Sequence, residues 1–236
     1  MESLRKVSMI DQKNNKIQGE IELDPQSKIT FLGKDGLVVF KGKPKRIRGF
    51  VLTVGNNAQV HIGKNANLRG KFHVGDGCKL IIGDNVQCSW AVLINAEEQT
   101  SITIGNDCLF SDISIYSSDS HSIFDVESKE RLNCAANIVL GNRVWLGRRV
   151  IVTKGVIIGD DVAVGAGSLV NKDLPSHSVC AGLPVKVLKR GTVWCQERTD
   201  VFPVSRVDTA TTYLKIRDAN LVTEREQSSS QVNNYL

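Results

Sequence analysis

Aliphatic residues recur at every sixth position in the C-terminal half of the chain, and this period constrains the fold more than any other feature. Six positions in succession follow it: Leu140, Leu146, Val152, Ile158, Val164 and Val170. Glycine directly follows four of these residues. An α-helix repeats its apolar face every 3.6 residues and a strand alternates every two, so neither explains a period of six. The spacing predicts a coil of short flat faces, with one aliphatic side chain of each face pointing inward.

The N-terminal half of the chain repeats with a period of 20 residues instead. Residues 54–73 align with residues 74–93, so that Val54 matches Val74. One coil cannot bury its apolar face alone, and stacked coils form backbone ladders about 4.8 Å apart. Glycine suits the corners, where the backbone needs a positive φ. An all-β solenoid therefore explains both repeats better than an ordinary β-sandwich, in which the strand spacing varies more.

The composition agrees with a long β architecture and argues against several other classes. The 236 residues are rich in valine and isoleucine, which favour strands, and no proline lies between Lys45 and Leu174. No apolar run approaches the roughly 18 residues of a membrane span. The charged start of the chain lacks the apolar core of a signal peptide, so we expect a cytoplasmic protein. Six cysteines without a CxxC pair indicate neither a disulfide framework nor a thiolate metal site.

Three sequence runs identify a family: VWLG, GAGSLVNKDLP and AGLPVKV. With them the chain resembles the hexapeptide-repeat acyltransferases over about residues 51–190. The resemblance implies a left-handed parallel β-helix over residues 51–183. We expect strands that cap the helix over residues 1–50, and a short C-terminal extension with a disordered tail over residues 184–236. The resemblance also implies acetyl-CoA as co-substrate and a homotrimer.

The repeat fails between about residues 117 and 136, so a protruding loop is expected there. Loops on a rigid scaffold often carry function, and this one contains His121, one of four histidines. An enzyme that moves an acetyl group from a thioester to a hydroxyl needs a base, and histidine titrates near neutral pH. The run SSDSHSIFD resembles the segment that carries the general-base histidine of hexapeptide O-acetyltransferases. The resemblance therefore assigns this role to His121.

Two further loop residues have alternative interpretations. Asp119 is a candidate to orient the imidazole of His121, and a backbone carbonyl is equally suited to do so. Arg131 is expected either to bind an anionic acceptor or to pair with Asp125 or Glu127. The sequence leaves both questions open.

Trp145 lies between two aliphatic residues of the repeat, Val144 and Leu146, so its side chain is expected to point outward. An exposed tryptophan is costly unless it lines a site, where it offers an apolar wall or an indole N–H donor. In the polysialic-acid capsule O-acetyltransferases that the chain resembles, a histidine of this loop and a tryptophan of this motif form the active site. The resemblance therefore assigns Trp145 to the active site and favours an anionic glycan, the sialic acid residues of a capsule, as acceptor.

Basic residues gather in the C-terminal coils, as the phosphates of coenzyme A require. By resemblance, the cofactor-binding residues lie in a groove between subunits and are Arg148, Lys154, Ala166, Lys172, Lys186 and Lys189. A solvated basic face is the alternative for each cation. The net charge is +5, and residues 34–48 hold six cations and one anion. This patch is suited to steering an anionic polymer or is simply a solvated edge, and no nucleic-acid-binding motif accompanies it.

Other functions fit the same solenoid less well. Serine acetyltransferases add a helical N-terminal domain, and nucleotide-sugar N-acetyltransferases add a nucleotide-binding domain. The sequence indicates neither of these domains. Other small sugars remain alternative acceptors. A zinc enzyme of the γ-type carbonic anhydrase kind needs three histidines, two of them closely spaced. Positions 61, 73, 121 and 177 offer no such pair, so no metal is expected. A non-catalytic binding module is the remaining alternative.

Overall fold

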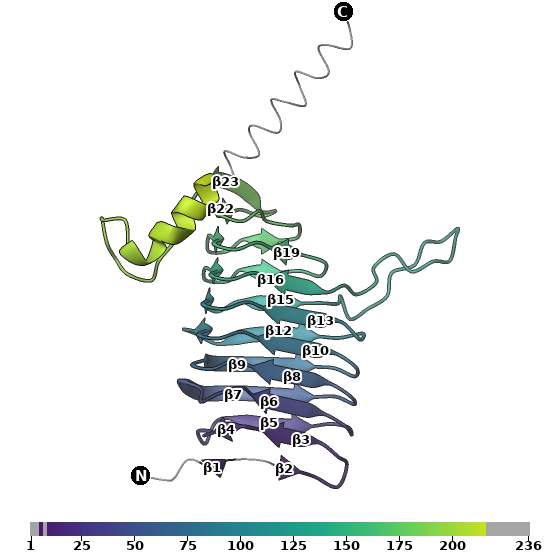
Figure 1. The fold of residues 1–236 in the computed structure, drawn as a ribbon. Helices are drawn as coiled ribbons and strands as arrows, with labels where there is room; N and C mark the ends of the chain where they lie inside the picture. The colour runs from purple at the N-terminus through teal and green to yellow at the C-terminus, as the bar shows by residue number, and fades with distance from the viewer. Residues whose placement is uncertain (1–4, 7–8, 216–236) are drawn as a thin grey trace, which may run out of the picture.

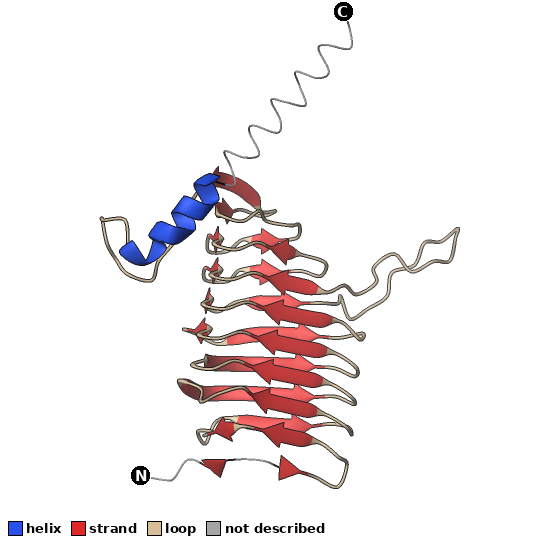
Figure 2. Cartoon of the chain, in the orientation of Figure 1, coloured by secondary structure: helices blue, strands red, loops and turns tan. Residues whose placement is uncertain are grey.

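Short strands alternate with tight corners throughout the chain, and successive coils stack into a β-solenoid. Figures 1 and 2 show this stack in the computed structural model, which describes residues 5–6 and 9–215. One face of the solenoid, here the first face, is a sheet of eight strands: β2 (Met9–Ile10), β3 (Lys16–Gln18), β6 (Leu37–Phe40), β8 (Gln59–Ile62), β10 (Lys79–Ile82), β13 (Ser101–Ile104), β16 (Ile138–Leu140) and β19 (Ile157–Ile158). All of its neighbouring strands are parallel except the pair β2–β3.

The other two faces belong to one sheet of 13 strands that bends around a corner. The second face contains β11 (Gln87–Cys88), β14 (Leu109–Phe110), β17 (Trp145–Leu146), β20 (Ala163–Val164) and β22 (Ser178–Ala181), and β23 (Lys186–Arg190) closes its end. The third face contains β5 (Lys28–Phe31), β12 (Val92–Ala96), β15 (Ser114–Tyr116), β18 (Ile151–Val152) and β21 (Leu169–Val170). Two long strands, β7 (Arg46–Val54) and β9 (Asn67–Val74), run over both faces.

The ladders confirm both predicted repeats. In the C-terminal half, Leu146 pairs with Val164, so one coil takes 18 residues, which is three steps of six. In the N-terminal half, Val60 pairs with Leu80, which gives the predicted coil of 20 residues. All six aliphatic residues of the hexapeptide series are at most 2% exposed, so the interior is one continuous column of stacked side chains.

The bend in β9 depends on Gly70. This residue has a φ of +125°, and a Cβ atom added to it would lie 2.0 Å from the carbonyl oxygen of Val92 in the next coil. A side chain at this position would therefore force the neighbouring strand away. Glycine allows β9 to turn the corner while the coils keep their ladder spacing.

The two ends of the solenoid differ. At the N-terminal end, strands expected to cap the helix pair in parallel with the first coils, β3 with β6 and β5 with β7, and β1 (Arg5–Lys6) pairs antiparallel with β4 (Glu20–Ile21). At the C-terminal end, β22 and β23 form an antiparallel pair. A helical turn η1 (Val204–Arg206) then leads into an α-helix over residues 207–215, drawn blue in Figure 2. The tail predicted to be disordered, residues 224–236, lies outside the described residues. No described helix is long and apolar enough to cross a membrane.

Candidate active site

The long loop leaves the solenoid after β15 and returns at β16, at the corner between the third and first faces, here the third corner. Figure 1 shows it projecting well beyond the stack, as the break in the repeat predicts. Ile102 pairs directly with Ile138, 36 residues later, which is twice the length of an 18-residue coil. The loop is therefore inserted at a corner without changing the register of the strands.

The coil that precedes the loop holds both the first residues of the loop and the segment of the loop that returns to the solenoid. Ser117 accepts hydrogen bonds from the amide of Glu97 (3.0 Å) and from the hydroxyl of Thr100 (2.6 Å). Arg131 forms a bidentate ion pair with Glu98, and its Nη2 donates at 2.9 Å. This pair, with a hydrogen bond from Ser118, lowers the pKa of Glu98 to about 2. The partner of Arg131 is thus neither of the loop carboxylates considered from the sequence.

Asn133 connects the outgoing and returning segments of the loop beside His121. Its side chain is buried, and Nδ2 donates to the backbone oxygen of His121 at 2.7 Å and to Oδ2 of Asp119 at 3.0 Å. Its Oδ1 accepts a hydrogen bond from the amide of Ile123 at 2.7 Å. These bonds hold the backbone of His121 and Ile123 and the side chain of Asp119.

Lys154 holds the same region from the following coil. Its ammonium pairs with Asp119 and donates to the backbone oxygen of Asn133 at 2.9 Å. The hydrogen bonds from Lys154 and Asn133 lower the pKa of the Asp119 carboxyl. The carboxylate of Asp119 therefore holds the loop, and no hydrogen bond joins it to the imidazole of His121. That imidazole is exposed, and no hydrogen bond to it is found among residues 5–6 and 9–215.

Trp145 points outward from β17 on the second face and is 42% exposed, as its place in the repeat predicts. The ring of Trp194 lies against it, with ring centroids 5.8 Å apart. The indole N–H of Trp194 donates to the backbone oxygen of Arg143 at 2.5 Å. Sequence reasoning missed Trp194 because it lies beyond the repeats and no spacing relates it to Trp145.

A buried carboxylate anchors the segment that carries Trp194. Asp161 is fully buried and accepts hydrogen bonds from Nε and Nη2 of Arg143 at 2.9 and 2.7 Å. Arg206 of η1 pairs with the same carboxylate. The carboxylate of Asp161 thus binds both the corner before Trp145 and the C-terminal segment whose Trp194 packs against Trp145.

The residues assigned to coenzyme A lie on different parts of the solenoid. Arg148 and Ala166 are exposed at the corner between the second and third faces, here the second corner. Lys154 and Lys172 lie at the third corner, and Lys186 and Lys189 are exposed on β23. Among these cations, Lys172, Lys186 and Lys189 form no ion pair within the described part of the chain.

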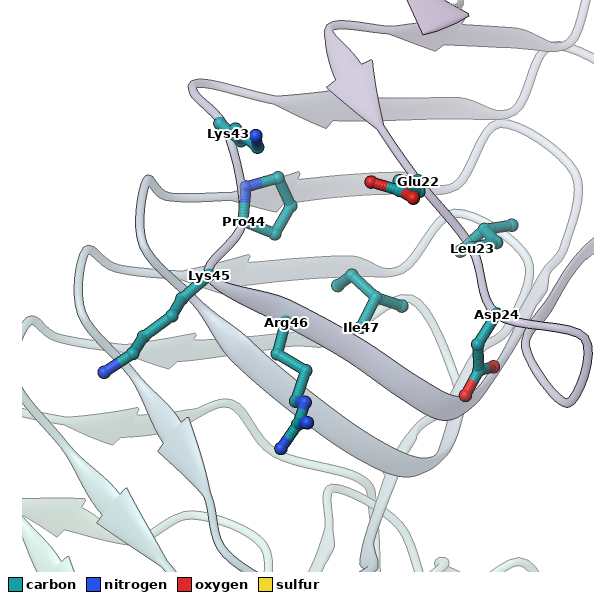
Figure 3. A pocket seen from close by; sticks show the side chains of 8 residues that line it. All are labelled: Glu22, Leu23, Asp24, Lys43, Pro44, Lys45, Arg46 and Ile47. Carbon is teal, nitrogen blue, oxygen red and sulfur yellow. The ribbon is translucent and has the colours of Figure 1, made fainter. Parts of the chain in front are cut away.

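The basic patch predicted over residues 34–48 borders a cavity of about 330 Å³ in the N-terminal coils. Figure 3 shows the side chains of Lys45 and Arg46 extending away from Glu22, which lies on the facing segment with Asp24. These two carboxylates offset part of the positive charge of the patch. The cavity is therefore of mixed charge.

One chain does not bring His121 and Trp145 together, because the loop that contains His121 projects from the third corner (Figure 1), whereas Trp145 lies in β17 on the second face. The stacked coils with one loop inserted at a corner form the solenoid that the hexapeptide repeat predicts. Residues 137–172 match the family model "Bacterial transferase hexapeptide (six repeats)".

Comparisons with known proteins specify the family further. A polysialic acid O-acetyltransferase of Escherichia coli O1:K1 / APEC is 35% identical over 142 residues, which are 60% of this chain and 45% of that protein. A galactoside O-acetyltransferase of Escherichia coli (strain K12) is 31% identical over 128 residues, 54% of this chain and 62% of that protein. A crystal structure of a polySia-specific acetyltransferase has a TM-score of 0.72 and 30% identity over 86% of this chain and 99% of that one. The chain therefore belongs to the hexapeptide-repeat acetyltransferase family, although it matches less than two thirds of the length of these two curated relatives.

Proposed function

We propose that the protein is an acetyl-CoA-dependent O-acetyltransferase of a bacterial surface polysaccharide, with the sialic acid residues of a polysialic acid capsule as acceptor. The observation that carries the proposal is His121: Asn133 holds its backbone and that of Ile123, while its imidazole is exposed and unpaired within the described residues. Family membership supports acetyl transfer, and the two relatives named for polysialic acid support the acceptor. Such an enzyme acts in the cytoplasm, before its product is exported.

A neutral imidazole on this loop takes the proton of the acceptor hydroxyl. The hydroxyl oxygen then forms the new ester bond, and the proton on His121 is returned to the departing thiol. Negative charge develops on the carbonyl oxygen during the attack and requires a donor. The indole N–H of Trp145 fits this role because it makes no hydrogen bond within residues 5–6 and 9–215. No acyl-enzyme intermediate is needed for this direct transfer.

The chain has the groups that acetyl-CoA requires. Acetyl-CoA supplies the acetyl group as an activated thioester. Lys172, Lys186 and Lys189 are exposed and unpaired within the described residues, so they are available to the phosphates, and Ala166 leaves its corner unobstructed. Arg148 differs from these lysines, because it lies 3.9 Å from Asp112 and over the ring of Trp90, so we do not assign it to the phosphates. Lys154 already binds Asp119, so its contribution is to hold the loop of His121.

A homotrimer explains why the two site residues lie apart in one chain. If the loop of one subunit lies over the second face of the next, His121 of the first meets Trp145 of the second. This arrangement predicts that mixed trimers of His121→Ala and Trp145→Ala subunits contain some intact sites. Such mixtures should regain transfer activity that neither variant has alone, and a mixture that stays inactive would contradict the shared site.

Substitution of His121 tests the proposed function directly. His121→Ala should lower kcat by about 10²- to 10⁴-fold, the usual contribution of a general base. Its affinity for coenzyme A, measured by calorimetry, should stay unchanged. The matched control is His61→Ala, which removes a histidine of the first face and should leave kcat within twofold of the wild type. Retained turnover in the His121 variant would exclude it as the base.

A further inference from the structure

Four arginines and one tryptophan lie along the second corner of the solenoid, in four of five successive coils. Arg48 in β7 and Arg69 in β9 precede the bend in successive coils. Trp90 lies at the same corner between β11 and β12, and Arg148 and Arg149 lie there between β17 and β18. With coils about 4.8 Å apart, these positions span four coil steps, or about 19 Å. We refer to these five residues as the corner ridge.

Trp90 orders the arginines on either side of it along the ridge. It is 52% exposed, and the guanidinium carbons of Arg69 and Arg148 lie 5.9 and 5.2 Å from the centroid of its ring. Stacking on an aromatic ring limits the freedom of an arginine side chain while the N–H groups at its edge stay available. Trp90 is not part of the core, so its ring orders cations at the surface instead of packing the interior.

The ridge carries a net positive charge. Arg69 forms no ion pair within the described residues. Asp112, at the same corner, forms ion pairs with both Arg148 and Arg149, each at 3.9 Å. Asp24, at the foot of the ridge, accepts hydrogen bonds from the amide of Gly49 and the hydroxyl of Ser27. Four arginines against two carboxylates leave an excess of two positive charges.

We propose that the corner ridge binds the carboxylates of an anionic glycan acceptor, so that successive acidic sugars lie along the second corner. This inference rests on the proposed function, because it assumes an acidic polysaccharide as acceptor. Arginine is suited to the role since its planar group binds a carboxylate with two parallel hydrogen bonds. Arginines of two neighbouring coils, and again of the coil three steps further on, offer cations at both ends of the ridge to separate carboxylates of a polymer that carries one carboxylate per sugar.

The ridge also leads to the candidate active site. Arg148 follows Trp145 by three residues, at the corner where the second face ends. A polymer on the ridge would therefore place one of its sugars near Trp145 and others along the coils that precede it. The phosphates of coenzyme A are the other anions with the same chemistry, and the experiment has to separate the two.

The experiment compares Arg69→Ala and Trp90→Ala with the control Lys79→Ala, which removes an exposed cation from β10 on the first face. Binding of a sialic acid polymer to the full-length protein is measured directly, and the KM values for polymer and acetyl-CoA are measured by release of free thiol. We expect both ridge variants to bind the polymer about three- to tenfold more weakly, with an equal rise in the KM for polymer. The kcat, the KM for acetyl-CoA and the control variant should not change.

The outcomes separate this inference from the proposed function. Polymer binding that is unchanged in Arg69→Ala, or equally weakened in Lys79→Ala, overturns the ridge even if the wild type transfers acetyl groups. A wild type that does not bind the polymer overturns it as well. A loss that appears in the KM for acetyl-CoA instead assigns the ridge to coenzyme A. If the wild type binds the polymer through Arg69 but transfers no acetyl group to it, the ridge stands and the proposed function fails.

Discussion

Replacing Asn133 by alanine should uncouple His121 from the solenoid without unfolding the coils. The buried amide makes three short hydrogen bonds: to the backbone oxygen of His121, to Asp119, and from the amide of Ile123. At about 1 kcal/mol each, their loss weakens the ordered loop by about 3 kcal/mol. The ladders above and below the loop do not use Asn133, so the melting temperature of the solenoid should change little.

The expected kinetic effect follows from the fraction of loops that hold His121 in place. A loss of about 3 kcal/mol corresponds to a factor of about 100 in an equilibrium constant, which sets the upper limit. Because the ion pairs of Arg131 and Lys154 remain, we expect kcat to fall by about 10- to 100-fold. The KM for acetyl-CoA should stay constant, since no cation assigned to that ligand is moved. Steady-state kinetics measures both quantities.

Two controls separate a positioning role from a general structural role. Asn137→Ala removes the acceptor of a single hydrogen bond, from the amide of Ser101, at the exposed end of the loop and should leave kcat within twofold. Hydrogen exchange should show faster exchange at the amide of Ile123 in Asn133→Ala, with the coils still protected. An unchanged kcat in a variant whose loop exchanges faster would refute the claim that this loop must be ordered for transfer.

Three further substitutions or conditions have defined outcomes. The pKa of Glu98 is about 2, below its ordinary value of 4.5, so the ion pair with Arg131 stabilises the loop fully above pH 4.5. This stabilisation is lost as the pH falls from 4.5 toward 2. The loop should then become progressively more sensitive to proteolysis, while the coils stay resistant. Asp161→Asn leaves Arg206 buried without its counter-charge and should cost about 3–5 kcal/mol, measured by chemical denaturation, with increased cleavage in residues 191–215. Lys172→Ala should raise the KM for acetyl-CoA about threefold, and an equal rise in the KM for the acceptor would contradict its assignment to the phosphates.

The sequence was sufficient to predict the coils because their packing follows a local rule. Each inward residue stacks on its equivalent 18 or 20 positions away, as Leu146 does on Val164, so the period alone identifies the interior. The same rule placed Trp145 on the outside. The contacts that hold the loop follow no such rule. Arg131 pairs with Glu98, 33 residues earlier, because the loop folds back on the preceding coil. The period of the repeat does not predict where an inserted segment lies.

The insertion also shows how the solenoid can position a reactive group at little cost to its core. Since Ile102 and Ile138 remain paired, all the inward side chains of the neighbouring coils keep their contacts, and the loop adds residues only outside the column. Glu98 holds the loop from the preceding coil and Lys154 from the following one, so its position is set by two rigid corners. A shift of either corner would move His121 relative to the scaffold. Loss of Glu98 or of Lys154 should therefore reduce kcat without lowering the stability of the coils, whereas a cavity in the interior series should reduce both.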